Sequence, residues 1–169
     1  MAESGIIDPD ERVELIVGEI ISMSPMSSRH AATVRKIAGF FQRILSEKSI
    51  VSVQMPIRLD DQSEPEPDVA LLRVVANQYA DAHPGPADVR LIVEVAQSSL
   101  DFDREVKIPL YARSGIVETW LVDLEAQQVE IFREPGPSGY ADHSRSGRAA
   151  SIAPQAFPEA AVKVGDLLA

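Results

Sequence analysis

The chain has 169 residues, of which 45% are hydrophobic and 25% are charged, proportions typical of a globular protein with its own core. It has no cysteine, which excludes disulfides and thiolate metal sites and fits a reducing compartment. No stretch approaches the roughly 18 apolar residues of a membrane-spanning helix. The acidic first residues lack the apolar core of a secretory signal. We therefore expect one domain over residues 1–169, cytoplasmic and with no membrane partner.

The net charge of −10 argues against an extended nucleic-acid surface, because phosphate binding depends on basic side chains. The charge is uneven, since residues 27–58 hold six basic residues and one acid. Within this block, Arg29, Lys36 and Arg43 recur every seven residues and would form one stripe on a helix. The stripe fits either a solvated helix face or a local contact for a polyanion.

The first predicted elements are a hairpin and a helix. Residues 12–23 contain two short apolar runs joined near Gly18, which predicts an N-terminal β-hairpin. Apolar residues at helical spacing then predict an amphipathic helix over residues 29–47. Ser27 or Ser28 is its expected N-cap.

Three strands are predicted in the middle of the chain. Apolar residues alternate over residues 51–59, which predicts a half-buried strand, and Pro56 places it at a sheet edge or a bulge. A polar turn leads to a second strand, Asp68 to Arg73. The run from Val89 to Ala96 is almost continuously apolar, as in a central strand covered on both faces.

The remaining elements are a helix, a hairpin and a tail. The helix is expected to begin after a cap at Ser98, Ser99 or Asp101, to reach about Arg113, and to be kinked or delayed by Pro109. Residues 117–124 and 128–134 then predict a strand hairpin, residues 135–148 a loop, and the tail a short strand with a helical turn. This order predicts an α/β fold, a mixed β-sheet flanked by helices.

Two carboxylates stand at the ends of these strands. Asp68 begins one strand and Glu94 lies near the end of the next. A buried carboxylate is costly unless it is paired or binds a cation. If the two strands pair antiparallel, the carboxylates converge, and two carboxylates with waters and substrate oxygens are a common Mg²⁺ ligand set. Such a site suits phosphodiester hydrolysis, in which a metal neutralises phosphate and a nearby cation orients the attacking water.

These residues also resemble a known family. The dipeptide Pro67-Asp68, a Glu in the next apolar strand and a later Lys are similar to the PD-(D/E)XK nuclease superfamily. The segments ELIVGEII, SSRHA, EPDVALL and LIVEV, followed by D-x₃-K-x₃-Y-x₃-G and VETWLVD, resemble the Uma-type restriction endonucleases of bacteria. The resemblance runs from about Glu14 to Asp123. It implies a restriction-endonuclease-like fold, Mg²⁺ dependence and hydrolysis of DNA.

The resemblance also assigns roles. Asp68 and Glu94 fall on the family's metal-binding Asp and Glu, and the carbonyl of Val95 can add a third ligand. The superfamily's lysine is expected two residues after Glu94, where this chain has Ala96. In this branch the lysine lies in the following helix, so Lys107 is the candidate that completes the catalytic set of Asp68, Glu94 and Lys107.

Structural explanations stand beside these roles. Asp68 can be a turn acid, Glu94 a buried structural carboxylate, and Lys107 the ion-pair partner of Asp103 one helical turn earlier. Tyr111 and Trp120 are expected in the core. Three residues are secondary candidates: Glu14, either near the metal or a hairpin-face charge; His30, either near phosphate or a surface or cap residue; and Asp103.

Three functional hypotheses follow. The first is a Mg²⁺-dependent endodeoxyribonuclease, in which Mn²⁺ can substitute, acting on DNA as a homodimer because two active sites match a two-fold duplex. The second is a catalytically inactive module on the same fold for DNA binding or assembly, favoured by the acidic charge and by Ala96. The third is an enzyme for another phosphate-bearing substrate, since a metal with two carboxylates does not identify the group cleaved.

Overall fold

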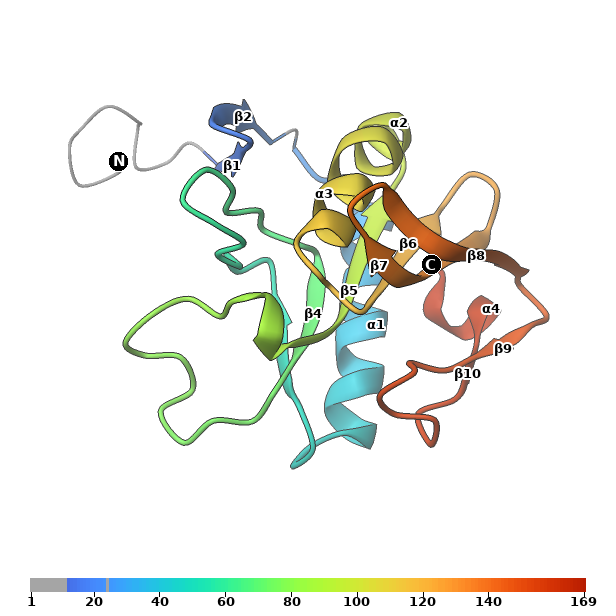
Figure 1. Cartoon of the computed structure of the whole chain (residues 1–169). Helices are drawn as coiled ribbons and strands as arrows, with labels where there is room; N and C mark the ends of the chain where they lie inside the picture. Colours follow the sequence, from blue (N-terminus) through green and yellow to red (C-terminus); the bar gives the residue numbers. More distant parts are fainter. Residues whose placement is uncertain (1–11, 24) are drawn as a thin grey trace.

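A mixed sheet with helices on both faces organises residues 12–23 and 25–169, which this computed structural model describes (Figure 1). Its strands are Ile50–Val53 (β3), Val69–Leu72 (β4), Val89–Ala96 (β5), Glu118–Asp123 (β6), Gln128–Gly136 (β7) and Gly139–Gly147 (β8). They lie in the order β3-β4-β5-β6-β7-β8. Neighbours are antiparallel except β5 and β6, which are parallel. The predicted α/β fold class is confirmed.

The N-terminal hairpin is also confirmed. Val13–Ile16 (β1) pairs antiparallel with Glu19–Ser22 (β2). The turn between them uses Val17 and Gly18, both with positive φ (51° and 81°), and glycine adopts such a conformation at little cost. The hairpin is tied to the rest of the chain by a bridge between Leu15 and Glu64.

The predicted amphipathic helix is Ser28–Ile44 (α1). Ser27 is its N-cap, and the Ser27 hydroxyl accepts a hydrogen bond from the backbone N–H of His30 at 3.1 Å. This bond satisfies one of the free amides of the first turn. The helix begins where expected and ends three residues early.

The two faces of the sheet bury different helices. On one face, alternate residues such as Val69, Leu91, Val93 and Val122 pack in one cluster with the apolar face of α1. On the other face, residues such as Ala70 and Ile92 pack with Tyr111. Because side chains alternate along a strand, Asp68 and Glu94 project from the second face.

The parallel pair β5 and β6 requires a crossover, and that crossover is the predicted second helix. It has three parts: Leu100–Phe102 (α2), a π-helical turn over Asp103–Lys107, and Ile108–Arg113 (α3). Pro109 lies in the first turn of α3, where its missing N–H is tolerated. Pro109 was expected to mark a late start or a kink of this helix. This is confirmed, because the π-helical turn ends at Lys107 and regular α-helix begins at Ile108, one residue before Pro109.

The predicted loop over residues 135–148 is wrong. Most of it forms the end of β7 and the strand β8, joined by a turn in which Gly136 pairs with Gly139. Strand β8 is polar and largely exposed at the edge of the sheet, so it lacks the apolar alternation that identifies a strand. Its backbone hydrogen bonds to β7 do not need apolar side chains.

Strand β3 is the other edge, as Pro56 predicted, but it is shorter than expected. It ends at Val53 because Gln54 adopts a left-handed backbone with φ of 51°. The short strands Ser151–Ile152 (β9) and Val162–Lys163 (β10) form a separate pair, followed by the helical turn Val164–Leu167 (α4). A 3₁₀ turn, Pro86–Asp88, precedes β5. The strand and helical turn expected in the tail are therefore present.

Two residues of the basic stripe on α1 bind backbone carbonyls of the C-terminal half of the chain. Arg29 donates to the carbonyl of Leu124 at 2.7 Å, and Lys36 donates to the carbonyl of Leu168 at 2.6 Å. Arg29 and Lys36 thus bind backbone carbonyls, and Lys36 and Arg43 are exposed, as on a solvated helix face. A polyanion contact stays a prediction. Among the described residues, no helix is both long and apolar enough to cross a membrane.

Candidate active site

Asp68 and Glu94 lie on adjacent strands at matching positions. Strands β4 and β5 pair antiparallel with Val69 opposite Val93, so the next position of the register sets Asp68 beside Glu94. The expected antiparallel pairing is confirmed. Both residues are buried, at 7% and 3% exposure, and both line the same pocket.

The Asp68 carboxylate is held by three donors. Its Oδ1 lies 2.9 Å from Nε2 of His30 and accepts from Nε2 of Gln54 at 3.0 Å. Its Oδ2 accepts from the backbone N–H of Val95 at 2.9 Å. Burial alone would raise the pKa of Asp68, but His30, Gln54 and the Val95 amide outweigh it and hold the pKa below its ordinary value. Asp68 is therefore an ionised, oriented carboxylate.

Glu94 has a different environment. Its Oε1 accepts from the Lys107 ammonium at 3.2 Å and from the Tyr111 hydroxyl at 2.5 Å. Burial, followed by the nearby carboxylates of Asp103 and Asp68, raises the pKa of Glu94, and Lys107 only partly opposes this. Oε2 has no hydrogen-bond donor among the residues that the structure describes, which leaves that oxygen for a ligand.

Lys107 is the centre of a buried ion-pair cluster. Its ammonium donates to Oε1 of Glu14 at 2.8 Å as well as to Glu94. The same Glu14 oxygen accepts from the backbone N–H of Glu66 at 2.8 Å. Burial lowers the pKa of Lys107, but Glu94 and Glu14 outweigh burial and raise it overall. Lys107 is therefore a permanent cation at the pocket wall.

The alternative pairing of Lys107 with Asp103 is wrong, since the Lys107 ammonium is bonded to Glu14 and Glu94. The Asp103 carboxylate instead accepts from the Ser99 hydroxyl at 2.6 Å. Burial raises the pKa of Asp103, although Lys107 and this hydrogen bond oppose the shift. The π-helical turn carries both residues, and both are 5% exposed and line the pocket. Asp103 is thus a neighbour of the site rather than a brace for Lys107.

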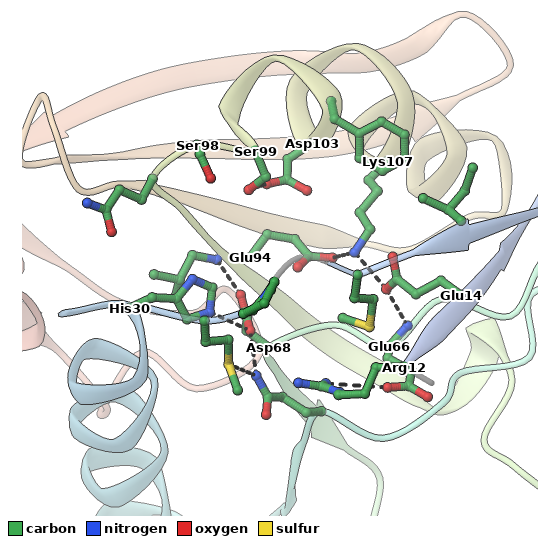
Figure 2. A pocket seen from close by; sticks show the side chains of 18 of the residues that line it. Arg12, Glu14, His30, Glu66, Asp68, Glu94, Ser98, Ser99, Asp103 and Lys107 are labelled. Carbon is green, nitrogen blue, oxygen red and sulfur yellow. Dashed lines mark hydrogen bonds and ion pairs between the residues drawn. The ribbon is translucent and has the colours of Figure 1, made fainter. Parts of the chain in front are cut away.

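The pocket itself has a volume of about 520 Å³ and is shown in Figure 2. The labelled side chains come from separate parts of the fold: Glu14 from the hairpin, His30 from α1, Asp68 and Glu94 from the sheet, and Lys107 from the crossover. Glu14 thus lies inside the pocket and is not a charge on the outer hairpin face. His30 points to Asp68, so it is neither a surface residue nor merely a cap.

Asp68 and Glu94 could provide some, but not all, of the ligands of a hard divalent cation such as Mg²⁺. Oxygen ligands suit Mg²⁺, which often keeps several waters and takes only one or two protein carboxylates. Within residues 12–23 and 25–169, no group of three or more His, Asp or Glu side chains forms a metal-binding cluster. Asp68 and Glu94 would therefore be the side-chain ligands, with water and substrate oxygens completing the set. His30 and Gln54 on Asp68 resemble the outer partners that orient a metal ligand.

Val95 occupies the strand position between Glu94 and Ala96. Its amide binds Asp68, and its side chain is in the core on the α1 face. Ala96 is fully buried against the crossover. A lysine there would meet Ile108 and Leu121.

Three residues with buried or paired side chains were not recognised in the sequence, and of these only Gln54 lines the pocket. Gln54 holds Asp68, yet in the sequence it was only one polar position of an alternating strand. Arg104 in the π-helical turn pairs with Glu130 of β7, whose side chain is fully buried. Glu130 also binds His143 at 2.8 Å. A signal was available for Glu130, because it interrupts the apolar faces of a buried strand. Trp120 is fully buried, as expected, and Tyr111 is both core and a partner of Glu94.

Comparisons with known proteins agree with this architecture. A solved structure, described as a putative nuclease belonging to DUF820 from Anabaena variabilis ATCC 29413, superposes with a TM-score of 0.77 at 15% identity and covers 98% of this chain and 94% of its own. That likeness supports the fold. No curated protein matches the chain. The family Uma2, with the description "Putative restriction endonuclease", matches residues 2–165. The chain therefore belongs to the Uma2 family.

Proposed function

We propose that the protein is a metal-dependent nuclease that hydrolyses DNA phosphodiester bonds in the pocket around Asp68 and Glu94. The observation that carries the proposal is the pairing of these two buried carboxylates at one position of the sheet, beside the Lys107 ammonium. Family membership supports the nuclease class. We take DNA as the substrate because the sequence resembles the PD-(D/E)XK nucleases, which hydrolyse DNA.

The proposed chemistry consumes one water. A new bond forms between the water oxygen and phosphorus, one ester P–O bond breaks, and the leaving oxygen takes up a proton. Mg²⁺ held by Asp68 and Glu94, with Mn²⁺ able to substitute, would supply neutralisation of the phosphate charge. Lys107 contributes a fixed positive charge, which stabilises the phosphate as negative charge accumulates on its oxygens.

The protein's own residues prepare this site. His30 and Gln54 fix the Asp68 carboxylate in its ionised form. Glu14 fixes the Lys107 ammonium by sharing it with Glu94. Tyr111 fixes the orientation of Glu94 through the same oxygen that faces Lys107. The arrangement is thus held in place before substrate binds, which avoids reorganisation during the reaction.

The test is cleavage of DNA by pure protein in Mg²⁺ and in Mn²⁺, with Asp68→Asn as the inactivating variant. The Asn side chain keeps the volume but loses the charge. Asp142→Asn, at an exposed position of β8, is the matched control and should retain wild-type activity. Undiminished cleavage by Asp68→Asn would contradict the proposal. Calorimetric titration with Mn²⁺ adds an independent readout, since absence of binding to the wild type would favour an inactive module on the same fold.

A further inference from the structure

The shape and charge of the pocket bear on which form of DNA it accepts. We infer that the substrate is an unpaired strand, entering on the order of one or two nucleotides at a time, rather than an intact duplex. The inference rests on the proposed function and narrows it. It depends on three features of the pocket: the depth of the carboxylates, the pairing of the cations and the apolar wall.

The carboxylates are too deep for an intact duplex. Glu94 is 3% exposed and Asp68 is 7% exposed, so a phosphate must enter the pocket to reach them. A pocket of about 520 Å³ lies in the range of small-molecule sites, roughly 300–1,000 Å³. Duplex DNA is stiff over many base pairs, and its bases stay stacked unless a nucleotide is extruded. A strand that is already unpaired enters without that cost.

The charge of the pocket also favours an unpaired strand over a duplex. Its basic side chains are Arg12, His30 and Lys107. Each is already paired with a carboxylate of the same pocket: Arg12 lies 3.6 Å from Glu66, His30 contacts Asp68, and Lys107 contacts Glu14 and Glu94. Duplex binding relies on several free cations placed along the phosphate backbone. Because every basic side chain of the lining is already paired with a carboxylate, the pocket has no row of free cations along which a duplex backbone could lie.

The lining of the pocket also includes apolar side chains from β2, from the segment between β2 and α1, and from α2. These residues, called the apolar wall, are Ile21, Met23, Met26 and Phe102. Aromatic rings stack on unpaired bases of any sequence, and thioethers make favourable contacts with rings. In a duplex the bases are paired and stacked on one another, so they cannot stack on these apolar side chains. With an unpaired strand, Phe102, the aromatic member of the apolar wall, would stack on a base of the bound strand.

An unpaired substrate also changes the expected assembly. A homodimer was expected because two active sites match the two strands of a duplex. A protomer that acts on one strand does not need that pairing.

The experiment offers one DNA sequence in three forms: single strand, blunt duplex, and duplex with an unpaired bulge. Cleavage is measured as kcat/KM in Mg²⁺ and in Mn²⁺. The single strand and the bulge should be cut roughly tenfold or more faster than the duplex, because unpairing costs a few kcal/mol. Equal or faster cleavage of the duplex would overturn the inference while leaving the nuclease proposal intact.

If none of the three forms is cut, the nuclease proposal fails, and binding then tests the inference separately. Wild-type protein with Mg²⁺ is titrated into fluorescently labelled single strand and duplex. Tighter binding of the single strand supports the inference. Equal or tighter binding of the duplex, or binding of neither, overturns it.

Phe102→Leu tests the apolar wall, because leucine keeps an apolar side chain at a half-buried position but cannot stack. KM for the single strand should rise about fivefold or more, from a stacking contribution of about 1–3 kcal/mol, with a smaller change in kcat. Phe40→Leu, on α1 and outside this pocket, is the matched control. An unchanged KM in Phe102→Leu would overturn the stacking role.

Discussion

The ammonium of Lys107 lies 2.8 Å from Oε1 of Glu14, although 93 residues separate the two in sequence. Glu14 belongs to the N-terminal hairpin and Lys107 to the π-helical turn of the crossover. The ion pair therefore joins two elements that are far apart in the sequence, and it fixes the cation next to Glu94.

Replacing Lys107 with methionine should destabilise the fold strongly. Glu14 and Glu94 would remain buried without their shared cation, and breaking a buried pair in this way costs about 3–5 kcal/mol. The free energy of unfolding in urea measures the loss. Lys48→Met, which removes an exposed lysine paired with Glu159, is the control and should have little effect. The double variant Glu14→Gln/Lys107→Met should regain part of the loss, and a Lys107→Met variant as stable as the Lys48→Met control would refute the argument.

The stability of metal-free protein should fall as pH rises, because of Glu94. Its pKa is raised by burial from the ordinary 4.5 to about 8 in the folded state. Between these values the folded chain keeps a proton that the unfolded chain has released, so raising the pH favours unfolding. The effect is complete above pH 8, where both states are ionised.

Urea unfolding of the wild type and of Glu94→Gln, in buffer with a chelator, measures this contribution. Relative to Glu94→Gln, the wild type should lose on the order of 1 kcal/mol or more across that window. Parallel pH profiles for the two proteins would mean that Glu94 is ionised at the same pH in both states.

Shortening Gln54 should weaken catalysis through Asp68. Asparagine tolerates the left-handed backbone at this position, but its side chain is too short to hold Oδ1 of Asp68. Hydrogen bonds to charged groups contribute about 1.5–3 kcal/mol, so kcat should fall about tenfold or more. Because the Gln54 hydrogen bond helps to lower the pKa of Asp68, the acid limb of the pH–rate profile should also move to higher pH.

Gln42→Asn, at an exposed position of α1, is the control for this change. It should leave both kcat and the pH profile as in the wild type. A Gln54→Asn variant with reduced kcat but an unmoved acid limb would show that Gln54 acts on something other than Asp68.

Added metal should stabilise the folded protein through the two carboxylates. A ligand that binds only the folded state contributes about 2.7 kcal/mol at a concentration of about 100 Kd. Thermal or urea unfolding with and without Mn²⁺ should show this gain in the wild type and in Asp142→Asn. It should be lost in Asp68→Asn, and removal of metal by a chelator should abolish it everywhere. Equal stabilisation of Asp68→Asn would place the metal elsewhere.

Local patterns in the sequence were enough for most of the elements. The hairpin, helix α1 and its Ser27 cap, the central strand β5 and the late start of α3 at Pro109 all follow from apolar periodicity, capping and proline geometry. Strand β8 was missed because its signal is not local. Its polar residues become a strand only by pairing with β7.

For the site, the sequence by itself singled out Asp68 and Glu94, because a carboxylate at the end of an apolar run is costly without a partner. It also offered Lys107, but with two possible roles. Only the tertiary structure decided that its ammonium binds Glu14 and Glu94 rather than Asp103. Likewise, only the structure brought His30 and Gln54 to Asp68. These contacts join residues that are distant in the chain, so they depend on strand register and on the path of the crossover, which no local pattern contains.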